Sequence, residues 1–318
     1  MKNNLLRVGV AVLAGSLVLT GCSRGDGGDS NGAADGASTS AQVADERIAA
    51  LGWGDADTLL ALGITPVAVA PWGAEADTDP SGVGPWATEM LGDAQPEKIF
   101  NVAQGVSADI VEQVTATNPD KIIAVNQAID AKAKEELEAI APTTVKPEGT
   151  TDWQIPWKDQ VKAIAKAVGK ESEGEELITK TEEAFEEFRN NHKDVQGKTA
   201  AMVMPYSGKL GLYTSGDGRG QFIENLGFEI PDELEGDGNS FFVDLAPENY
   251  SKLNDVDYLF VLDYNGAVDE LKKDKTFTGL DIVKDGRVRY LDTDTGNAMS
   301  MPNPVTIPWA VDKVDAAL

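Results

Sequence analysis

Side chains that act as nucleophiles, general bases or metal ligands are scarce in this sequence. Among its 318 residues there is one cysteine, Cys22, and one histidine, His192, and there is no Gly-x-Ser-x-Gly motif of the type that presents a hydrolase serine. A single histidine does not build a usual His-rich metal site. We therefore expect no catalytic residue and no metal ion held by the protein itself.

Aromatic and amide side chains, in contrast, gather where strand-like runs end, which favours binding over catalysis. In a parallel α/β sheet, ligands bind in the crevice beyond the carboxyl ends of the strands. Any one of these aromatics is more often a packing residue, but their recurrence at strand ends in both halves of the chain predicts a wide small-molecule cleft with apolar walls. The candidates are Trp53, Trp72, Trp86 in the loop that follows Trp72, Asn126, Tyr206, Tyr213, Tyr264 and, in the loop from 292 to 304, Met299.

The hydrophobic pattern supplies the elements that must position these side chains. Short apolar runs of strand type alternate with runs of helix type, and this alternation predicts parallel sheets covered by helices. In the first half we expect strands near 47–53, 66–70, 98–102, 121–125 and 143–146, with helices at 55–62, 108–117 and 135–140. In the second half we expect strands at 199–204, 210–214, 258–262 and 288–291, with helices at 221–226, 247–253, 268–272 and 308–317.

Two helical patterns separate these α/β regions. The first, at 158–168, is broken at Gly169, and the second runs from 175 to 192 with an apolar face and a strongly acidic opposite face. The second pattern contains no Gly or Pro, so we interpret it as a rigid connector. The predicted fold is α/β, with two α/β lobes at 47–170 and 198–318, one long rigid bridging helix within 171–197, and a ligand cleft between the lobes.

The N-terminus carries an export signal. Residues 1–7 are short and basic, an apolar run follows from 8 to 19, and Cys22 comes directly after Leu-Thr-Gly. The apolar run is too short to span a bilayer as a helix, and Leu-x-Gly-Cys resembles a bacterial lipobox. We interpret residues 1–21 as a lipoprotein signal peptide, Cys22 as the site of lipid attachment, and the Gly-, Ser- and Asp-rich residues 22–46 as a flexible tether. An ordinary signal peptide with an incidental cysteine is the alternative.

The formal net charge of −26 limits the partners of the chain. Such an acidic surface repels nucleic acid and anionic lipid, so we expect no nucleic-acid binding and a membrane association that depends on the lipid anchor alone. The expected location is the extracytoplasmic face of the cell membrane, with two acyl chains on Cys22 providing stable attachment. We expect a monomer.

Several segments resemble one known family. The runs at 48–57, 59–69 and 111–123 are similar to the iron-siderophore and cobalamin binding proteins of ABC importers, the helical-backbone (class III) type of substrate-binding lipoprotein. The same holds for 213–219 before 225–228, for 245–253 before Asp257, and for 307–310. The resemblance covers nearly everything from Arg47 onward and implies two α/β lobes joined by one long helix.

The resemblance also implies roles for particular residues. One exposed glutamate on each lobe, here Glu112 and Glu248, would pair with arginines of the membrane permease, and Arg219 is the best-matched arginine for the ligand site. Because arginines are few and the body is acidic, we expect a hydroxamate-type ferric siderophore rather than a tri-anionic catecholate. The iron would arrive already chelated, so no cofactor is needed.

The predicted function is therefore a lipid-anchored, non-enzymatic receptor that delivers a ferric siderophore to ABC permease subunits. A long helical hinge predicts small lobe movements on binding. Cobalamin and haem binding are the alternatives within the same fold. An exported α/β hydrolase is the alternative from a different class.

Overall fold

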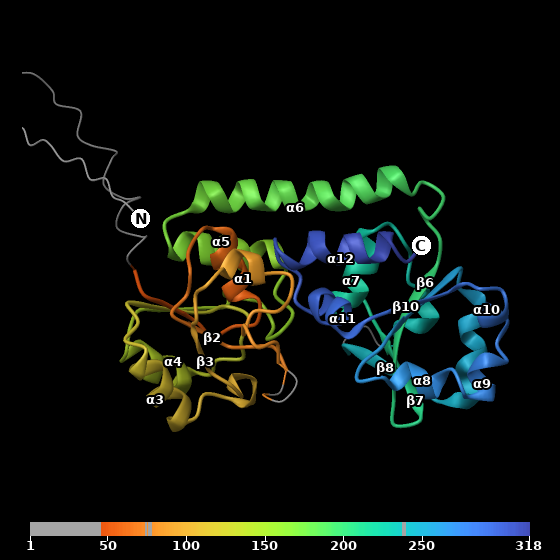
Figure 1. Ribbon diagram of the computed structural model, residues 1–318, viewed down its shortest axis with the longest axis horizontal. Helices are drawn as coiled ribbons and strands as arrows, with labels where there is room; N and C mark the ends of the chain where they lie inside the picture. Colours follow the sequence, from red (N-terminus) through yellow and green to blue (C-terminus); the bar gives the residue numbers. More distant parts are fainter. Residues whose placement is uncertain (1–45, 74, 76–77, 237–239) are drawn as a thin grey trace, which may run out of the picture. The chain divides into compact units, whose positions relative to one another are not determined.

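The computed structural model describes residues 46–73, 75, 78–236 and 240–318. This part of the chain contains two five-stranded sheets, each accompanied by helices (Figure 1). The predicted signal peptide, Cys22 and all but the last residue of the predicted tether lie outside the described residues. Two α/β sheets with helices are the fold class expected from the alternating pattern.

The first sheet is entirely parallel, as predicted. Its strand order is β3-β2-β1-β4-β5, and β1 is central, with Ala49 opposite Ala68 of β2 on one side and Ile122 of β4 on the other. The strand expected at 98–102 is displaced and shorter, because it ends at Lys98 and the 3-10 helix η3 begins at Val102. The strands are β1 (Ile48–Ala50), β2 (Ala68–Val69), β3 (Glu97–Lys98), β4 (Lys121–Ala124) and β5 (Thr143–Val145).

Helices cover both faces of the first sheet, and successive strand residues therefore contribute to different cores. Ile48 and Ala50 of β1 pack in a cluster with α1 and α5, whereas Ala49 and Leu51 pack in another cluster with α3 and α4. This is the burial expected for a parallel sheet with helices on both sides. The helices are α1 (Asp55–Ala61), α2 (Thr88–Leu91), η3 (Val102–Gln104), α3 (Ala108–Ala116), α4 (Ala131–Glu138) and α5 (Trp157–Ala167).

The second sheet is mixed, which corrects the expectation of a parallel sheet. Its order is β10-β9-β6-β7-β8; the first three strands are parallel, and β7 pairs antiparallel with both β6 and β8. Ser207 and Gly208 cause the reversal, because both have positive φ, at 47° and 76°, as a tight hairpin turn requires. The strands are β6 (Ala200–Tyr206), β7 (Lys209–Tyr213), β8 (Phe242–Leu245), β9 (Tyr258–Leu262) and β10 (Val288–Leu291).

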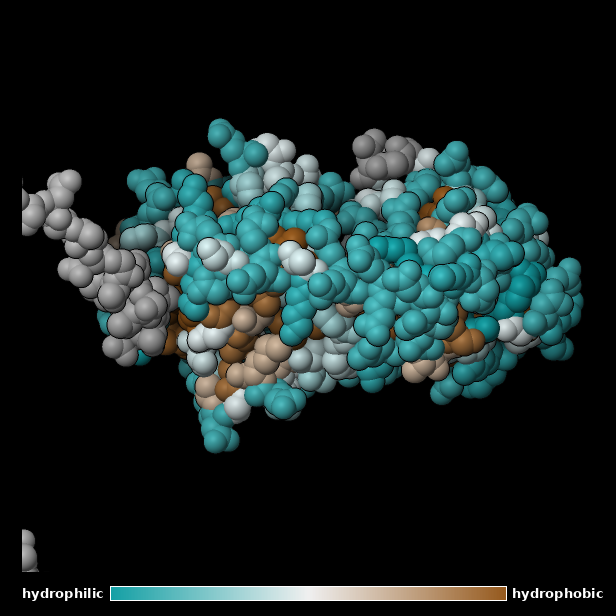
Figure 2. All heavy atoms as spheres, turned by 90° about the horizontal axis from the view of Figure 1, so that it is seen from above, coloured by the Kyte–Doolittle hydropathy of each residue, from teal (hydrophilic) through white to brown (hydrophobic). Residues whose placement is uncertain are grey.

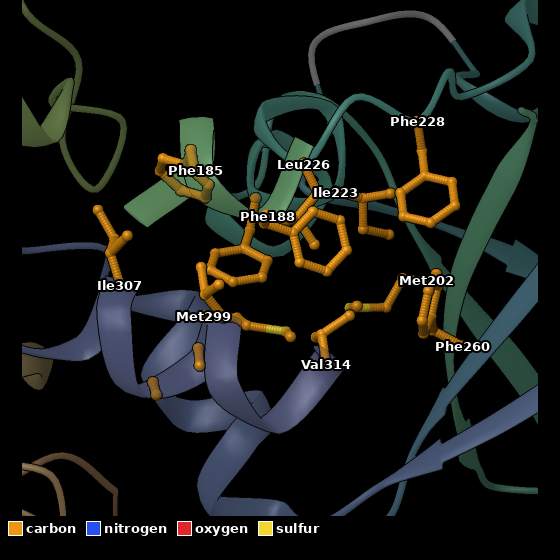
Figure 3. Close-up of a cluster of buried hydrophobic side chains, with 14 of the residues drawn as sticks. Phe185, Phe188, Met202, Ile223, Leu226, Phe228, Phe260, Met299, Ile307 and Val314 are labelled. Atoms are coloured by element: carbon orange, nitrogen blue, oxygen red, sulfur yellow. The ribbon is translucent and has the colours of Figure 1, made fainter. Parts of the chain in front are cut away.

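Helices also surround the second sheet, and one core lies between it and α6. Figure 3 shows Phe185 and Phe188 of α6 in this core with Met202 of β6, Phe260 of β9 and Met299 of α11. The segment expected to be a loop at 292–304 contains α11, whose first turn is capped by the Asp292 side chain. The helices are α7 (Gly218–Asn225), η4 (Asp232–Leu234), η5 (Pro247–Asp255), α8 (Ala267–Leu271), α9 (Lys275–Thr278), α10 (Asp281–Lys284), α11 (Thr293–Ser300) and α12 (Thr306–Asp315).

The long helix α6 (Glu171–Asn191) lies between the two α/β regions in the sequence and packs against α5 and α12. Its buried positions recur every three or four residues, as a helix with one apolar face requires. It begins four residues earlier than predicted and includes Gly174, where a Cβ atom would lie 2.5 Å from the Cβ of Ala165 in α5. Glycine therefore permits the close approach of α5 and α6.

The surface is consistent with the high acidic content of the chain. Figure 2 shows a largely hydrophilic face on which hydrophobic residues occupy smaller areas. Within the described ranges, no helix has the length and apolar character needed to cross a membrane.

Candidate functional site

A cavity of about 630 Å³ lies beyond the strand ends of both sheets. Its walls include most of the binding residues predicted from the sequence, which lie far apart along the chain and are brought together by the fold. The predicted residues that line the cavity are Trp53, Trp72, Asn126, Tyr213, Arg219 and Tyr264.

Three predicted residues lie outside this lining. Trp86 is half-buried and donates its indole N–H to Asp57, 2.9 Å away, while Tyr206, the last residue of β6, donates its hydroxyl to Asp244 of β8. Met299 is fully buried in the core of Figure 3, because the segment expected to be a loop folds into α11 and turns this side chain inward. These positions give the three residues packing and positioning contacts instead.

The wall contributed by the first α/β region is built from tryptophans. Trp53 contacts Trp72 edge-on, with ring centroids 4.1 Å apart, and also contacts Trp153 at 4.5 Å. Trp153 has a positive φ of 66°, which is unusual for a bulky residue and is found chiefly where the surroundings enforce it. The result is a continuous aromatic surface.

The topology of the first sheet places two of these groups side by side. The strand order reverses between β1 and β4, and such a switch point opens a crevice at the carboxyl ends of the strands. Trp53 follows β1 and Asn126 follows β4, and their loops are joined where the Trp53 N–H donates to the Asn126 carbonyl at 3.1 Å. The Asn126 side chain donates back to the Trp53 carbonyl at 2.9 Å.

The second α/β region contributes the charged side chains of the cavity wall. Arg219, at the start of α7, donates to both carboxylate oxygens of Asp217 and, at 3.1 Å, to the Tyr264 hydroxyl. Its guanidinium carbon also lies 3.9 Å from the centre of the Tyr213 ring. Gly296 permits the Tyr264 position, because a Cβ atom there would lie 2.5 Å from the Tyr264 hydroxyl.

Burial and the Asp217–Arg219 ion pair determine which side chains of this wall are charged. Burial alone would lower the pKa of Arg219, but the hydrogen bonds and charge of Asp217 outweigh it and raise the pKa, so the guanidinium stays protonated. Burial raises the pKa of Tyr213 and Tyr264, so both remain neutral phenols. Arg219 and Asp217 are the charged side chains of the cavity lining among the described residues, and their charges cancel.

Four important lining residues are not among those predicted from the sequence: Trp153, Asp217, Phe241 and Phe242. Asp217 lies within the segment 213–219 that carried the resemblance, and its spacing to Arg219 was the available signal. Phe241 and Phe242 are 39% and 40% exposed; Phe242 begins the unpredicted strand β8, and Phe241 directly precedes it. No periodic pattern marks Trp153, which lies in the loop before α5.

The predicted docking glutamates and the single histidine lie away from the cavity. Glu112 is exposed on α3, and Glu248 is exposed in η5. His192, at the end of α6, contacts Asp315 of α12. Among the described residues, no group of three or more His, Cys, Asp or Glu side chains is arranged to hold a metal ion.

Comparison with known proteins identifies the family of this two-sheet cavity protein. A family model described as "Periplasmic binding protein" matches residues 48–295, which is well over half of the chain. The chain belongs to the periplasmic binding protein family. This result confirms the family resemblance found in the sequence.

Individual relatives cover nearly the whole chain. The Fe(3+)-citrate-binding protein YfmC of Bacillus subtilis is 24% identical over 92% of this chain and 91% of its own length. A periplasmic solute binding protein of Mycobacterium smegmatis superposes with a TM-score of 0.75, at 28% identity, over 86% of this chain and 91% of its own. Streptococcus pneumoniae PiaA in complex with ferrichrome superposes with a TM-score of 0.68, at 28% identity, over 86% and 92%.

Family membership decides between the two predicted classes of function, a non-enzymatic binding protein and an exported α/β hydrolase. Periplasmic binding proteins bind solutes outside the cytoplasm and act with ABC permease components; they are not enzymes. The chain is therefore an extracytoplasmic binding protein, and the alternative of an exported α/β hydrolase is excluded.

Proposed function

We propose that this periplasmic binding protein captures a ferric siderophore, preferentially of the hydroxamate type, and delivers it to an ABC importer. The single observation that carries the ligand preference is the Asp217–Arg219 pair, which leaves the cavity lining with a cation but no net charge. A relative that binds Fe(3+)-citrate and a structural neighbour bound to ferrichrome support the siderophore class.

Charge balance favours a neutral or weakly charged iron complex. A ferric tris-catecholate carries three negative charges, and burying such an ion requires several unpaired cationic partners. Here the carboxylate of Asp217 already occupies two donor positions of the Arg219 guanidinium. A hydroxamate complex, in which the three ligand charges cancel that of Fe³⁺, meets no such electrostatic penalty.

The two walls suit the two kinds of surface on such a complex. The tryptophan wall of Trp53, Trp72 and Trp153 provides apolar contact with the organic backbone. Tyr264 and Asn126 offer hydroxyl and amide groups, which can bond to the oxygen atoms around the metal. Iron would be held by the siderophore, with the protein recognising the outside of the complex.

Intrinsic fluorescence tests this proposal directly, because three tryptophans line the cavity. The soluble body should be titrated with ferric desferrioxamine, a ferric tris-catecholate, ferric citrate, cyanocobalamin and haemin, with free tryptophan as the control for light absorption. We expect ferric desferrioxamine to quench with a micromolar or lower Kd and the catecholate to bind at least about 100-fold more weakly. Tightest binding of the catecholate would overturn the hydroxamate preference. Tightest binding of cyanocobalamin or haemin, or no quenching at all, would overturn the siderophore function.

The export signal fits this function. A lipid on Cys22 would keep the receptor near its permease, while the tether lets the body sample the surrounding solvent. Cys22→Ser should release a protein that binds its ligand normally but supports import poorly. Retention of the variant in the membrane fraction would contradict the lipid anchor.

Two exposed glutamates and the long helix α6 would serve the delivery of the ligand to the permease. Glu112 and Glu248 would dock on permease arginines, one from each predicted lobe. The packing of α6 against both α5 and α12 supports its role as a rigid bridge between the lobes at 47–170 and 198–318. A continuous helix in that position favours small lobe movements on ligand binding.

A further inference from the structure

A fully buried carboxyl group, that of Asp55, lies behind the tryptophan wall of the cavity. Asp55 is the first residue of α1 and has no exposed surface. One of its oxygens accepts the backbone N–H of Val125 at 2.8 Å. The other accepts the N–H of Asn126 at 3.3 Å and the side-chain amide of Gln160 at 2.7 Å.

The partners of Asp55 lead directly to residues that line the cavity. The side chains of Asn126 and Gln160 both donate to the carbonyl of Trp53, at 2.9 and 3.3 Å. The carboxylate therefore ties together the loop after β1, the loop after β4 and the helix α5. Trp53 and Asn126 line the cavity, whereas Asp55 does not.

The backbone is shaped around this carboxylate. A Cβ atom on Gly52 would lie 2.1 Å from an Asp55 oxygen and 2.7 Å from the Asn126 nitrogen, which no real side chain tolerates. The position of the Asp55 carboxylate therefore requires glycine at residue 52, and the loop that carries Trp53 folds over this carboxylate.

We propose that Asp55, as a carboxylate, is the positioning residue that holds Trp53 and Asn126 in their binding geometry and thereby sets the affinity of the cavity. The identity of the ligand rests on the function proposed above; the positioning of the wall does not. Acting through Trp53 and Asn126, Asp55 would touch no ligand atom.

The protonation state of Asp55 matters because its carboxylate is the acceptor in each of the three hydrogen bonds described above. Burial raises its pKa to about 6, and the hydrogen bonds from Gln160, Val125 and Asn126 oppose that rise. From the loops after β1 and β4 and from α5, it is faced by the uncharged Gly52, Asn126 and Gln160, and its charged neighbour among the described residues is Asp57 of α1. Protonation converts one accepting oxygen into a donor, so the affinity for ligand should fall as the pH decreases through about 6.

Asp57 provides a matched control within the same helix. It is equally enclosed, at 3% exposure, and it accepts hydrogen bonds from Trp86 at 2.9 Å and Asn303 at 3.0 Å. Neither of these partners lines the cavity. Losing the Asp57 carboxylate should therefore affect the stability of the fold without displacing the tryptophan wall.

The test compares Asp55→Asn with Asp57→Asn, using ferric desferrioxamine as the probe. At about pH 8, Asp55→Asn should weaken binding about 10-fold or more, because an amide cannot accept all three hydrogen bonds, and Asp57→Asn should change it less than about 2-fold. At about pH 5 the wild-type protein should approach the affinity of Asp55→Asn, since its own carboxylate is then protonated. Equal losses in both variants, or a wild-type advantage that persists at low pH, would overturn the proposal.

A second readout separates this inference from the choice of ligand. Closely packed tryptophans give a near-ultraviolet circular dichroism signal in the ligand-free protein, and Asp55→Asn should reduce it while Asp57→Asn leaves it intact. If the dichroism changes in this way but the wild-type protein does not bind ferric desferrioxamine, the siderophore function is refuted and the positioning role of Asp55 is supported. Should Asp55→Asn not fold, Gln160→Met removes one donor to the same carboxylate and to Trp53. Unchanged dichroism and affinity in Gln160→Met would then refute the positioning role.

Discussion

The guanidinium of Arg219 and the carboxylate of Asp217 form two parallel hydrogen bonds, of 2.7 and 2.8 Å, in the wall of the cavity. The same carboxylate caps α7 by accepting the backbone N–H of Arg219 at 2.9 Å. Both side chains are mostly buried, at 13% and 7% exposure, so solvent screens the pair weakly. One aspartate therefore both begins the helix and neutralises the cation of the site.

Removing this counter-ion should change which iron complexes bind. In Asp217→Asn the positive charge of Arg219 is no longer cancelled, so anionic complexes gain a partner. We expect the affinity for ferric citrate, relative to that for ferric desferrioxamine, to increase about 10-fold, a change of about 1.4 kcal/mol. Fluorescence titration with both complexes measures this ratio.

Asp130→Asn is the matched control, because Asp130 caps α4 by accepting the Ala133 N–H at 2.7 Å and does not line the cavity. Asparagine caps a helix about as well as aspartate, so the cap itself should cost either variant only the charge–dipole contribution, about 0.3–1 kcal/mol of unfolding free energy. Only Asp217→Asn should shift the ligand ratio. A parallel change in affinity for both complexes would show that Asp217 acts through folding alone.

Trp153 should contribute to affinity although it lies in a loop. Its ring contacts Trp53 at 4.5 Å and forms one end of the tryptophan wall. Trp153→Ala should weaken the binding of ferric desferrioxamine about 10-fold, because aromatic contact area is lost. Isothermal titration calorimetry is the suitable measurement, since the substitution also removes a fluorophore.

Trp309→Ala is the corresponding control. Trp309 packs edge-on against Trp86, with ring centroids 5.8 Å apart, and does not line the cavity. We expect this variant to lose stability while its affinity stays within about 2-fold of the wild-type value. If Trp153→Ala binds as tightly as Trp309→Ala, the tryptophan wall does not extend to Trp153.

The parts of the site that could be predicted are those fixed by local sequence patterns. Trp53 and Asn126 follow apolar runs that become β1 and β4, and the carboxyl ends of neighbouring parallel strands meet at one edge of a sheet. The α6 helix was predictable for a similar reason, because its buried positions repeat at a helical period. In both cases the sequence signal lies within a single element or two adjacent ones.

The remaining features depend on contacts between distant segments. Phe242 lines the cavity because β8 pairs antiparallel with β7, which is distant from it in the sequence, and the hydrophobic pattern does not reveal this pairing. Met299 is buried because Asp292 caps a helix where glycine and polar residues resemble a loop. Asp55 begins the helix predicted at 55–62, but its role behind Trp53 depends on a contact with Gln160 of the distant helix α5.

The buried carboxyl of Asp57 should make stability decrease as the pH rises. Burial raises its pKa from 3.8 to about 7, with the charge of Asp55 adding to the rise and hydrogen bonds from Asn303 and Trp86 opposing it. Between about pH 4 and 7 the folded state thus keeps a proton that the unfolded chain has released, and its stabilising contribution declines through this window. Each such proton changes the unfolding free energy by about 1.4 kcal/mol per pH unit.

Asp57→Asn should flatten this dependence. Urea unfolding of both proteins at about pH 5 and 8 should show the substitution to be most destabilising at the lower pH and less so, or stabilising, at the higher pH. Glu187→Gln on the exposed face of α6 should keep the wild-type slope. A pH dependence in Asp57→Asn that equals the wild-type dependence would mean that Asp57 is ionised throughout.

Removal of the two predicted docking carboxylates should separate import from binding. Glu112 and Glu248 are both exposed, on α3 and η5, and neither lines the cavity. The double variant Glu112→Ala with Glu248→Ala should reduce uptake of the iron complex in cells by about 10-fold or more, because buried carboxylate–arginine pairs at an interface are lost. Its Kd for ferric desferrioxamine should remain within about 2-fold of the wild-type value.

The control must remove the same amount of charge, since the chain carries a net charge of −26 that affects every encounter with another protein. Glu135→Ala with Glu187→Ala removes two equally exposed carboxylates, on α4 and α6. Uptake should be nearly normal in this pair, because general electrostatic steering changes little. An equal loss of uptake in both double variants would assign the effect to net charge, and a loss of ligand binding in the first would place those glutamates in the fold of the site instead of at the permease.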